Sequence, residues 1–441
     1  MRRAVIATAV LSLTASFVTA CQLIAGIDVL PIGDDASSGD GAADVVPMEA
    51  ASGADACAFM CSGPTLPARP SGAATADTGS FVVALSALRL GFMPDGGAPA
   101  SLDLDCTVSD GGAGTGACTP HQGGTTPADD PGGGDNGLYQ VFSTAKGVDF
   151  MSMLAPQQFI DNGLTTVLLK VVEYNGQTDD PQVSVLAFYS GGHFPDDAYD
   201  EAGTFDAASP YAPPAWGSPP PRWTVDPASA IVASGSVSAL RASTDAYVSG
   251  GVLVASFTSL FVPLVGPNDG DPIGGQGTAT SALVYVDATS AVLTARISTD
   301  GAGTSLYDGH VVGSLSTKNA LSALGPFSDL GVIDASLHDE RFCNNPKTGT
   351  YPLLKQAFCS NADLATARNN APSGQCATVC DGISFAYGFT ALPAALGGAA
   401  TFPVANGKKC ANSSDPMQNF NCCEEAGVDA AWVDECAPDW Q

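Results

Sequence analysis

The chain has 441 residues, of which 45% are hydrophobic, and a formal net charge of −29. Neutralising phosphates needs Lys and Arg, and only 16 of them stand against 45 acidic residues, so the charge balance excludes a nucleic-acid-binding protein. The apolar fraction is high enough for a real core, which excludes global disorder. The length suits two or three domains.

The first 21 residues have the layout of an export signal. Met1-Arg2-Arg3 is basic, Ala4–Phe17 is apolar, and Val18-Thr19-Ala20 places small residues before Cys21. This string resembles the signal peptide and lipobox of bacterial lipoproteins. The resemblance implies cleavage after residue 20, an acylated Cys21 and a permanent lipid anchor in the cell envelope. Gln22 stands where an Asp can mark inner-membrane retention, so we expect the outer membrane.

A transmembrane anchor is the alternative for this segment. No charged residue occurs from Ala4 to Ile27, and that length could span a bilayer. Its polar residues make it weakly apolar for a span; they are Thr8, Ser12, Thr14, Ser16, Thr19 and Gln22. We therefore favour the lipid anchor.

Residues 21–78 are expected to form an acidic, flexible tether. No Lys or Arg occurs between Arg3 and Arg69, and Asp and Glu are mixed with Ala, Gly and Ser. Such a composition cannot bury enough apolar surface to offset its ordering entropy. Cys57 and Cys61 would give this tether its first fixed point.

Residues 79–316 have a strand-like pattern. Leu102–Val108 alternates apolar and polar residues, and Leu164–Tyr174 runs into the turn pair Asn175-Gly176, with a returning strand at 182–190. Further strands are expected at 221–226, 229–234, 245–249, 251–258, 260–265, 281–287, 290–298 and 304–315. This spacing is typical of an all-β sandwich or jelly roll. One short helix is expected near 149–160.

Residues 317–441 are expected to form a smaller helical module rich in cysteine. Helices are predicted at 318–324, 351–368 and 381–392, the first two capped by Thr317 and Thr350. The predicted fold is thus mainly β, with a β-sandwich or jelly-roll-like body and a mostly helical, disulfide-rich C-terminal module.

Thirteen cysteines leave twelve after the lipidated Cys21, an even number that an oxidising compartment would pair. The disulfide candidates are Cys57, Cys61, Cys106, Cys118, Cys343, Cys359, Cys376, Cys380, Cys410, Cys422, Cys423 and Cys436. The spacing of Cys106 and Cys118 suits a disulfide across a hairpin or loop. A redox role for that pair, or a zinc site at Cys376 and Cys380, lacks a nearby cation or histidine.

Calcium is the one metal the sequence suggests. Asp103, Asp105, Asp135 and Asn136 place oxygen ligands on or near a glycine-rich loop, which Ca²⁺ accepts. The acidic string 268–271 is a second candidate. Solvated turns are the competing interpretation in a chain so rich in Asp, and we expect no tightly bound cofactor.

No catalytic constellation stands out. His193 is the most plausible catalytic histidine, and Gly382–Ala386 only approaches a G-x-S-x-G elbow around Ser384. The proline-rich stretch 210–223, with Trp216 and Trp223, is either a recognition surface or a loop over the body. We favour the loop.

Several strings resemble a group of exported lipoproteins of unknown function from high-GC Gram-negative bacteria. They are Leu102-Asp103-Leu104-Asp105, Asp135-Asn136-Gly137-Leu138, Tyr174-Asn175-Gly176, Asp179-Asp180-Pro181-Gln182-Val183, Asp308-Gly309, Lys355-Gln356-Ala357-Phe358-Cys359, Ala362-Asp363 and Cys380-Asp381-Gly382-Ile383-Ser384. This resemblance implies no particular chemistry. We expect a membrane-anchored binding or envelope structural protein with a protein or glycan ligand. The alternatives are a secreted hydrolase with a loop-borne site near His193 or His310, and a Ca²⁺-dependent carbohydrate-binding module.

Overall fold

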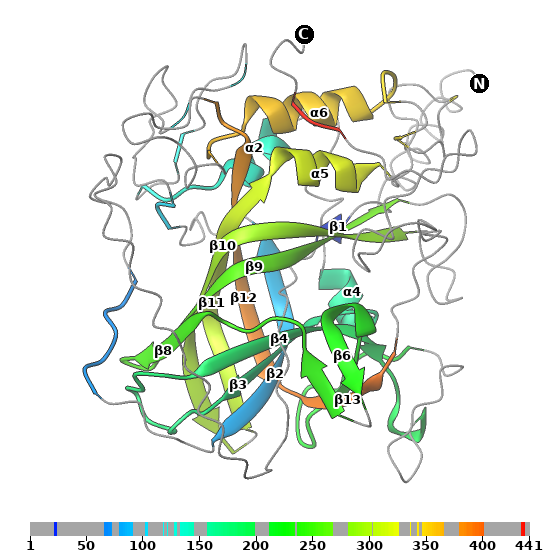
Figure 1. Cartoon of the computed structure of the whole chain (residues 1–441). Helices are drawn as coiled ribbons and strands as arrows, with labels where there is room; N and C mark the ends of the chain where they lie inside the picture. Colours follow the sequence, from blue (N-terminus) through cyan, green and yellow to red (C-terminus); the bar gives the residue numbers. More distant parts are fainter. Residues whose placement is uncertain are drawn as a thin grey trace, which may run out of the picture.

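The computed structural model describes a mainly β molecule with a cap of helices at one end (Figure 1). The residues described are 22–23, 66–72, 79–90, 102–104, 118, 121, 128–129, 133–144, 157–198, 211–233, 236–267, 281–301, 303–325, 336, 342–343, 346–365, 379–400 and 434–436. The prediction of a mainly β fold is confirmed.

Eleven strands form one continuous sheet. They are β1 (Gln22–Leu23), β2 (Ser80–Leu90), β3 (Val167–Val172), β4 (Ser184–His193), β5 (Arg222–Val225), β8 (Asp245–Ser249), β9 (Val252–Pro267), β10 (Ser281–Asp300), β11 (Gly303–Ser316), β12 (Gly382–Pro393) and β13 (Ala395–Ala399). Their order is β1-β9-β10-β11-β12-β2-β3-β4-β5-β13, with β8 also paired to β9. Every pairing is antiparallel except that of β13 with β5. The described strands thus form one large sheet, not the two stacked sheets of the expected sandwich; a two-stranded sheet of β6 (Ala230–Ala233) and β7 (Ser236–Ala239) lies beside it.

The sheet curls until strands far apart in its order meet. Asp180 and Val248 exchange two backbone hydrogen bonds of 2.8 Å, and Val183 N donates to Ala246 O at 3.1 Å. These bonds join β8 to the segment that leads into β4. Gly250 and Gly251, both at positive φ, make the two-residue turn from β8 to β9 that such a hairpin requires.

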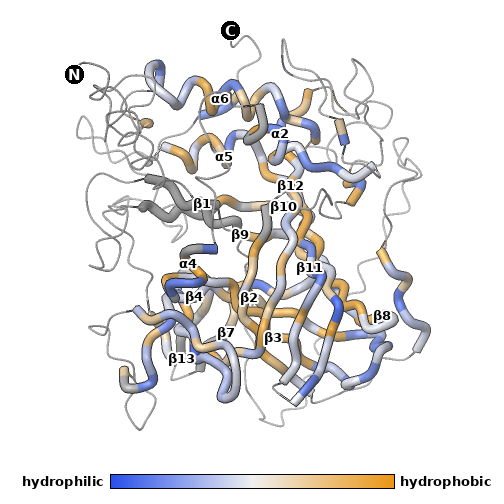
Figure 2. Tube along the Cα trace, turned by 180° about the vertical axis from the view of Figure 1, so that it is seen from behind, coloured by the Kyte–Doolittle hydropathy of each residue, from blue (hydrophilic) through white to orange (hydrophobic). Residues whose placement is uncertain are grey.

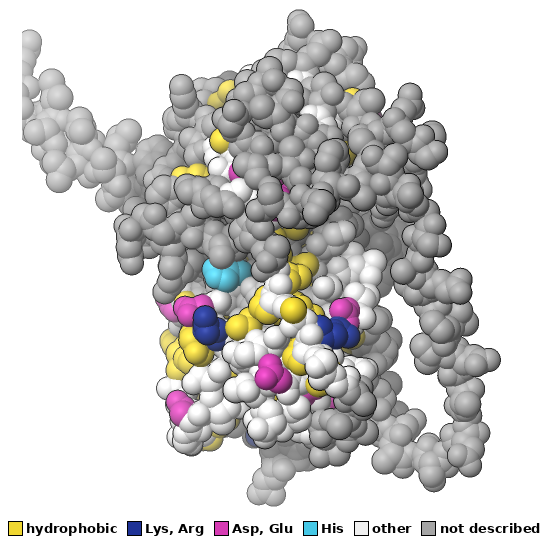
Figure 3. Space-filling model, turned by 90° about the vertical axis from the view of Figure 1, so that its left-hand side faces the viewer, with side chains coloured by type: hydrophobic (Ala, Val, Ile, Leu, Met, Phe, Trp, Pro, Cys, Tyr) yellow, Lys and Arg dark blue, Asp and Glu magenta, His cyan; other side chains and the backbone are white. Residues whose placement is uncertain are grey.

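The interior of the curl is apolar and close-packed. Its largest fully buried side chains include Trp223, Tyr189, Tyr387, Phe188 and Phe385. Hydrophobic stretches run along the strands, and hydrophilic ones collect at the ends of the body (Figure 2). On the face shown in Figure 3, the described surface is mostly uncharged, as a chain with 14% charged residues requires.

Helices occupy two places. The cap consists of α2 (Gly137–Thr144), α5 (Thr317–Leu324) and α6 (Tyr351–Ser360), and α4 (Gln157–Asp161) lies beside β2. Gln157 fixes α4 through hydrogen bonds with Leu88 N and Ser86 O. Short 3₁₀ turns occur at Asp196–Ala198 and Pro227–Ser229.

The separate helical C-terminal module is not what the described residues show. The predicted helix at 381–392 is wrong: these residues form most of β12, which lies between β11 and β2 inside the main sheet. Residues 382–389 are buried throughout, so no period-two pattern marks them as a strand. The predicted helix at 351–368 ends at Ser360.

Two other expectations change at the N-terminal side. Leu102–Leu104 lie outside any strand, and the rest of that predicted strand is outside the described residues. Gln22 and Leu23 pair with Val265 and Leu264 of β9, so the segment after Cys21 contacts the sheet at its start. Residues 66–72 also contact the sheet. Arg69 forms an ion pair with Asp245 of β8, and its guanidinium carbon lies 4.9 Å from the centroid of the Tyr247 ring.

Candidate functional site

The cap is joined to the sheet by a buried polar cluster, and a disulfide lies beside it. Cys118 and Cys380 are bonded across 262 residues of chain, with Cα atoms 5.2 Å apart. Residues 361–365 follow α6 and pair with the start of β12, through Leu364 N to Gly382 O at 3.1 Å and the reciprocal bond at 2.8 Å. These contacts bring Asp363 against Ser384 of β12 and Gly137 of α2.

Asp363 organises this junction. Its carboxylate accepts the Ser384 N–H at 2.8 Å and the Ser384 hydroxyl, while Ser384 Oγ accepts the Gly137 N–H at 2.6 Å. A Cβ on Gly137 would lie 2.7 Å from Asp363 Oδ2, so only glycine allows this approach. Ser384 is fully buried and donates its proton to a carboxylate. It therefore holds α2 on the sheet and is not placed to attack a substrate.

Asp135 fixes the chain beside this junction. Its Oδ2 accepts the Leu104 N–H at 2.5 Å, and its own N–H donates to Leu102 O at 3.0 Å. Both Asp135 and Asn136 are buried. Three predicted calcium ligands (Asp103, Asp135 and Asn136) are thus described, but the Asp135 carboxylate serves a backbone donor. The described residues contain no group of three or more His, Cys, Asp or Glu that could hold a metal ion. Asp105 and the second candidate, 268–271, lie outside the described residues.

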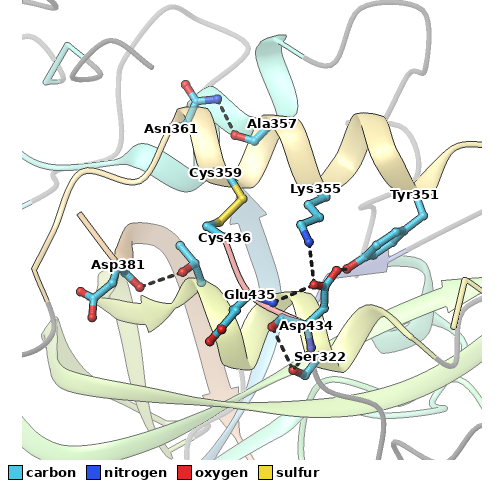
Figure 4. The surroundings of a disulfide bond; sticks show 11 residues. Ser322, Tyr351, Lys355, Ala357, Cys359, Asn361, Asp381, Asp434, Glu435 and Cys436 are labelled. Carbon is cyan, nitrogen blue, oxygen red and sulfur yellow. Dashed lines mark hydrogen bonds and ion pairs between the residues drawn. A yellow bond between two sulfur atoms is a disulfide. The ribbon is translucent and has the colours of Figure 1, made fainter. Parts of the chain in front are cut away.

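A second disulfide attaches residues 434–436, here called the strap, to the cap (Figure 4). Cys436 bonds to Cys359 of α6 across 77 residues of chain. Asp434 lies between α5 and α6. Its carboxylate accepts the Tyr351 hydroxyl and the Lys355 ammonium, each at 2.6 Å, and its N–H donates to Ser322 Oγ at 3.1 Å.

These contacts are shielded from water. The Lys355 and Asp434 side chains are only 12% and 19% exposed, so their ion pair is screened less than a surface pair. Burial, and then the hydrogen bond to the Asp434 carboxylate, raise the pKa of Tyr351, which keeps its hydroxyl protonated as a donor. The arrangement is suited to clamping the strap rather than to moving protons.

His193 is held as a structural residue. Its Nδ1 lies 2.7 Å from Ala212 O, and its ring packs edge-on against Trp223 with centroids 5.2 Å apart. Burial lowers the pKa of His193, which favours the neutral ring. Ala212 N also donates to His193 O at 2.9 Å, and the ring centroids of Trp216 and Trp223 lie 6.1 Å apart. Residues 211–221 of the proline-rich stretch therefore form a loop beside the end of β4, as predicted, whereas Arg222 and Trp223 belong to β5.

His310 occupies a different place, on β11 opposite Thr294 and Gly388. Burial lowers its pKa, and the nearby Asp308 charge opposes that shift. No hydrogen bond to a described residue reaches its Nδ1.

The disulfides correct one prediction from spacing. Cys118 pairs with Cys380 and not with Cys106, because the fold brings the start of β12 to it. Cys343 is also disulfide-bonded. Cys21, Cys57, Cys61, Cys106, Cys376, Cys410, Cys422 and Cys423 lie outside the described residues, so the acylation of Cys21 stays a prediction.

No family model, curated protein or solved structure matches this chain. None of the described helices is both long and apolar enough to cross a membrane.

The sequence alone points to no role for Asp363, Asp434, Tyr351 or Lys355. One signal was available for the strap site. Tyr351, Lys355 and Cys359 recur at intervals of four residues, which places them on one side of a helix. Asp434 had no such signal, because its partners are about 80 residues away in sequence.

Proposed function

We propose that this chain is an exported protein, anchored by lipid at Cys21 in the outer membrane, whose body serves binding or envelope structure rather than catalysis. The observation that carries the proposal is the pair of disulfides, Cys118–Cys380 before β12 and Cys359–Cys436 on α6. Disulfides persist in oxidising compartments and are rare in the cytosol. The basic, apolar and small-residue sequence of positions 1–20 before Cys21 supplies the corresponding address.

The geometry of the polar residues supports a non-catalytic role. Ser384, Asp363 and Asp135 are buried, and their hydrogen bonds are made within the protein. His193 is packed against Trp223, and its Nδ1 is engaged by a backbone carbonyl. Side chains used in this way stabilise a scaffold. A protein or a glycan is the class of ligand we expect for it.

Acylation is tested by expressing wild type and Cys21→Ser in a Gram-negative host. We expect wild type in the outer-membrane fraction with the mass of a triacylated N-terminus, and Cys21→Ser released in soluble form. Cys57→Ser is the matched control, because it removes a thiol outside the lipobox and should stay acylated. A Cys21→Ser protein that remains acylated and membrane-bound would end the proposal.

The non-catalytic role is tested separately on the soluble Cys21→Ser protein. Glycan-array and pull-down screens should return a ligand, while a panel of ester, peptide and glycoside substrates should show no turnover. Turnover that disappears in His193→Ala but not in the exposed control Asp196→Asn would favour the hydrolase instead.

A further inference from the structure

The strap and α6 share a matching spacing. Tyr351, Lys355 and Cys359 follow one another at intervals of four residues along α6, so they form one stripe. Asp434 contacts Lys355, and Cys436, two residues later, is bonded to Cys359. Four residues advance a helix by about 6 Å, and two residues advance an extended chain by about 6.6 Å. An Asp-x-Cys segment therefore fits a Lys-x₃-Cys stripe.

The other side of the strap is held by α5. Ser322 Oγ accepts the Asp434 N–H at 3.1 Å, and Lys318 Nζ lies 3.7 Å from Glu435 Oε2. Two of the 16 basic residues in this acid-rich chain thus pair with two neighbouring acidic residues. These two ion pairs can form whether or not Cys436 is bonded to Cys359.

Loop closure alone would not choose this disulfide. Cys343 lies 16 residues before Cys359 and Cys376 lies 17 after it, whereas Cys436 is 77 residues away. Closing the longer loop is disfavoured roughly tenfold by chain entropy. Specific contacts must overcome that entropic disadvantage. The contacts of Asp434 with Tyr351, Lys355 and Ser322 lie closest to the Cys359–Cys436 bond, and we call them the Asp434 clamp.

We propose that Ser322 of α5 and Tyr351 and Lys355 of α6 form a docking site for the chain's own residues 434–436. These residues bind before the disulfide forms, and their binding selects Cys436 as the partner of Cys359. Asp434 is the positioning residue. The thiols of Cys359 and Cys436 then lose two hydrogens to a disulfide oxidant, R–S–S–R, which leaves as two R–SH. This assignment does not depend on acylation of Cys21.

Oxidative refolding tests the selection. The reduced Cys21→Ser chain is refolded in a glutathione redox buffer, and its disulfides are mapped by mass spectrometry over time. Asp434→Asn with Lys355→Met should slow formation of the Cys359–Cys436 bond by about tenfold, the chain-entropy disadvantage that the clamp must offset. The charge swap Asp434→Lys with Lys355→Asp should recover much of the rate. Asp196→Asn with Lys347→Met makes the same charge changes at exposed positions and should refold as wild type does.

A second measurement tests docking without refolding. In a Cys359→Ser background, the Cys436 thiol should react with iodoacetamide several-fold more slowly than in the same protein carrying Asp434→Asn. Equal alkylation rates would show that the strap does not dock without its disulfide. An unchanged rate of disulfide formation in the Asp434→Asn and Lys355→Met protein would equally overturn the proposal.

Discussion

The curled sheet and the cap are stabilised by different kinds of interaction. In the sheet, backbone ladders and an apolar interior predominate: β9 and β10 pair from Ser281↔Pro267 to Arg296↔Val252, and Phe385 and Tyr387 are buried among strands. At the cap, the carboxylates of Asp363 and Asp434 and the Cys359–Cys436 disulfide hold segments that are far apart in sequence, and Cys118–Cys380 lies beside them. The sheet is therefore stabilised mainly by buried apolar surface, whereas the cap is stabilised mainly by individual hydrogen bonds, ion pairs and a disulfide.

The largest expected effect is at the junction between the cap and the sheet. Replacing both Cys118 and Cys380 with Ser should lower the free energy of unfolding by about 4–5 kcal/mol, because a long loop is no longer closed in the unfolded chain. Urea denaturation of the soluble Cys21→Ser protein would measure it. A loss below about 1 kcal/mol would mean that the polar contacts hold the cap without the bond.

The sheet should respond to loss of volume. Phe385→Ala removes a fully buried ring and should cost about 4 kcal/mol, whereas Phe385→Leu should cost much less. The same denaturation experiment, with far-UV circular dichroism, would report it. Equal costs for the two variants would indicate that this strand is not packed as described.

The buried junction should depend on hydrogen bonding. Asp363→Ala leaves the buried Ser384 N–H and hydroxyl without their acceptor and should cost about 3 kcal/mol. Asp363→Asn keeps one acceptor oxygen and should recover part of that loss. If Asp363→Asn and Asp363→Ala are equally destabilised, charge matters at this junction more than the acceptor does.

The smallest effect concerns pH at the sheet. Because burial lowers the pKa of His193 in the folded protein, the unfolded chain binds more protons as the pH falls below about 6.5. Stability should therefore decrease over that window, and His193→Asn should reduce the decrease. Thermal unfolding between pH 5 and 7.5 would show it, and a rise in wild-type stability on acidification would contradict the sign.

Sequence patterns predicted most strands of the sheet and the helices α5 and α6, because these elements carry local signals. The strand Val167–Val172 carries β-branched residues beside a turn pair, and strands at 245–249 and from 252 onward are separated by two glycines, all local signals. Residues 382–389 of β12 are buried on both sides, so their pattern is compatible with helix or strand. Pairing with the distant strands β11 and β2 makes this segment a strand, and one sequence does not reveal that pairing.

The same limit applies to the candidate sites. Spacing predicts that Cys118 pairs with the nearby Cys106, whereas its partner in the fold is Cys380, which lies 262 residues away. The Asp135 string looked like a cation loop, yet its carboxylate binds a backbone N–H inside the protein. Whether a carboxylate binds a cation or accepts a hydrogen bond inside the protein depends on how buried it is, and burial cannot be read directly from one sequence.

The bond between Cys118 and Cys380 has a consequence for proteolysis. It makes the 262-residue interval between them a covalent ring that includes the nine described strands from β3 to β11. A protease that cuts once inside this ring does not release a fragment, because both new ends remain joined through the two sulfur atoms. Cleaved protein should migrate as one species until a reductant is added.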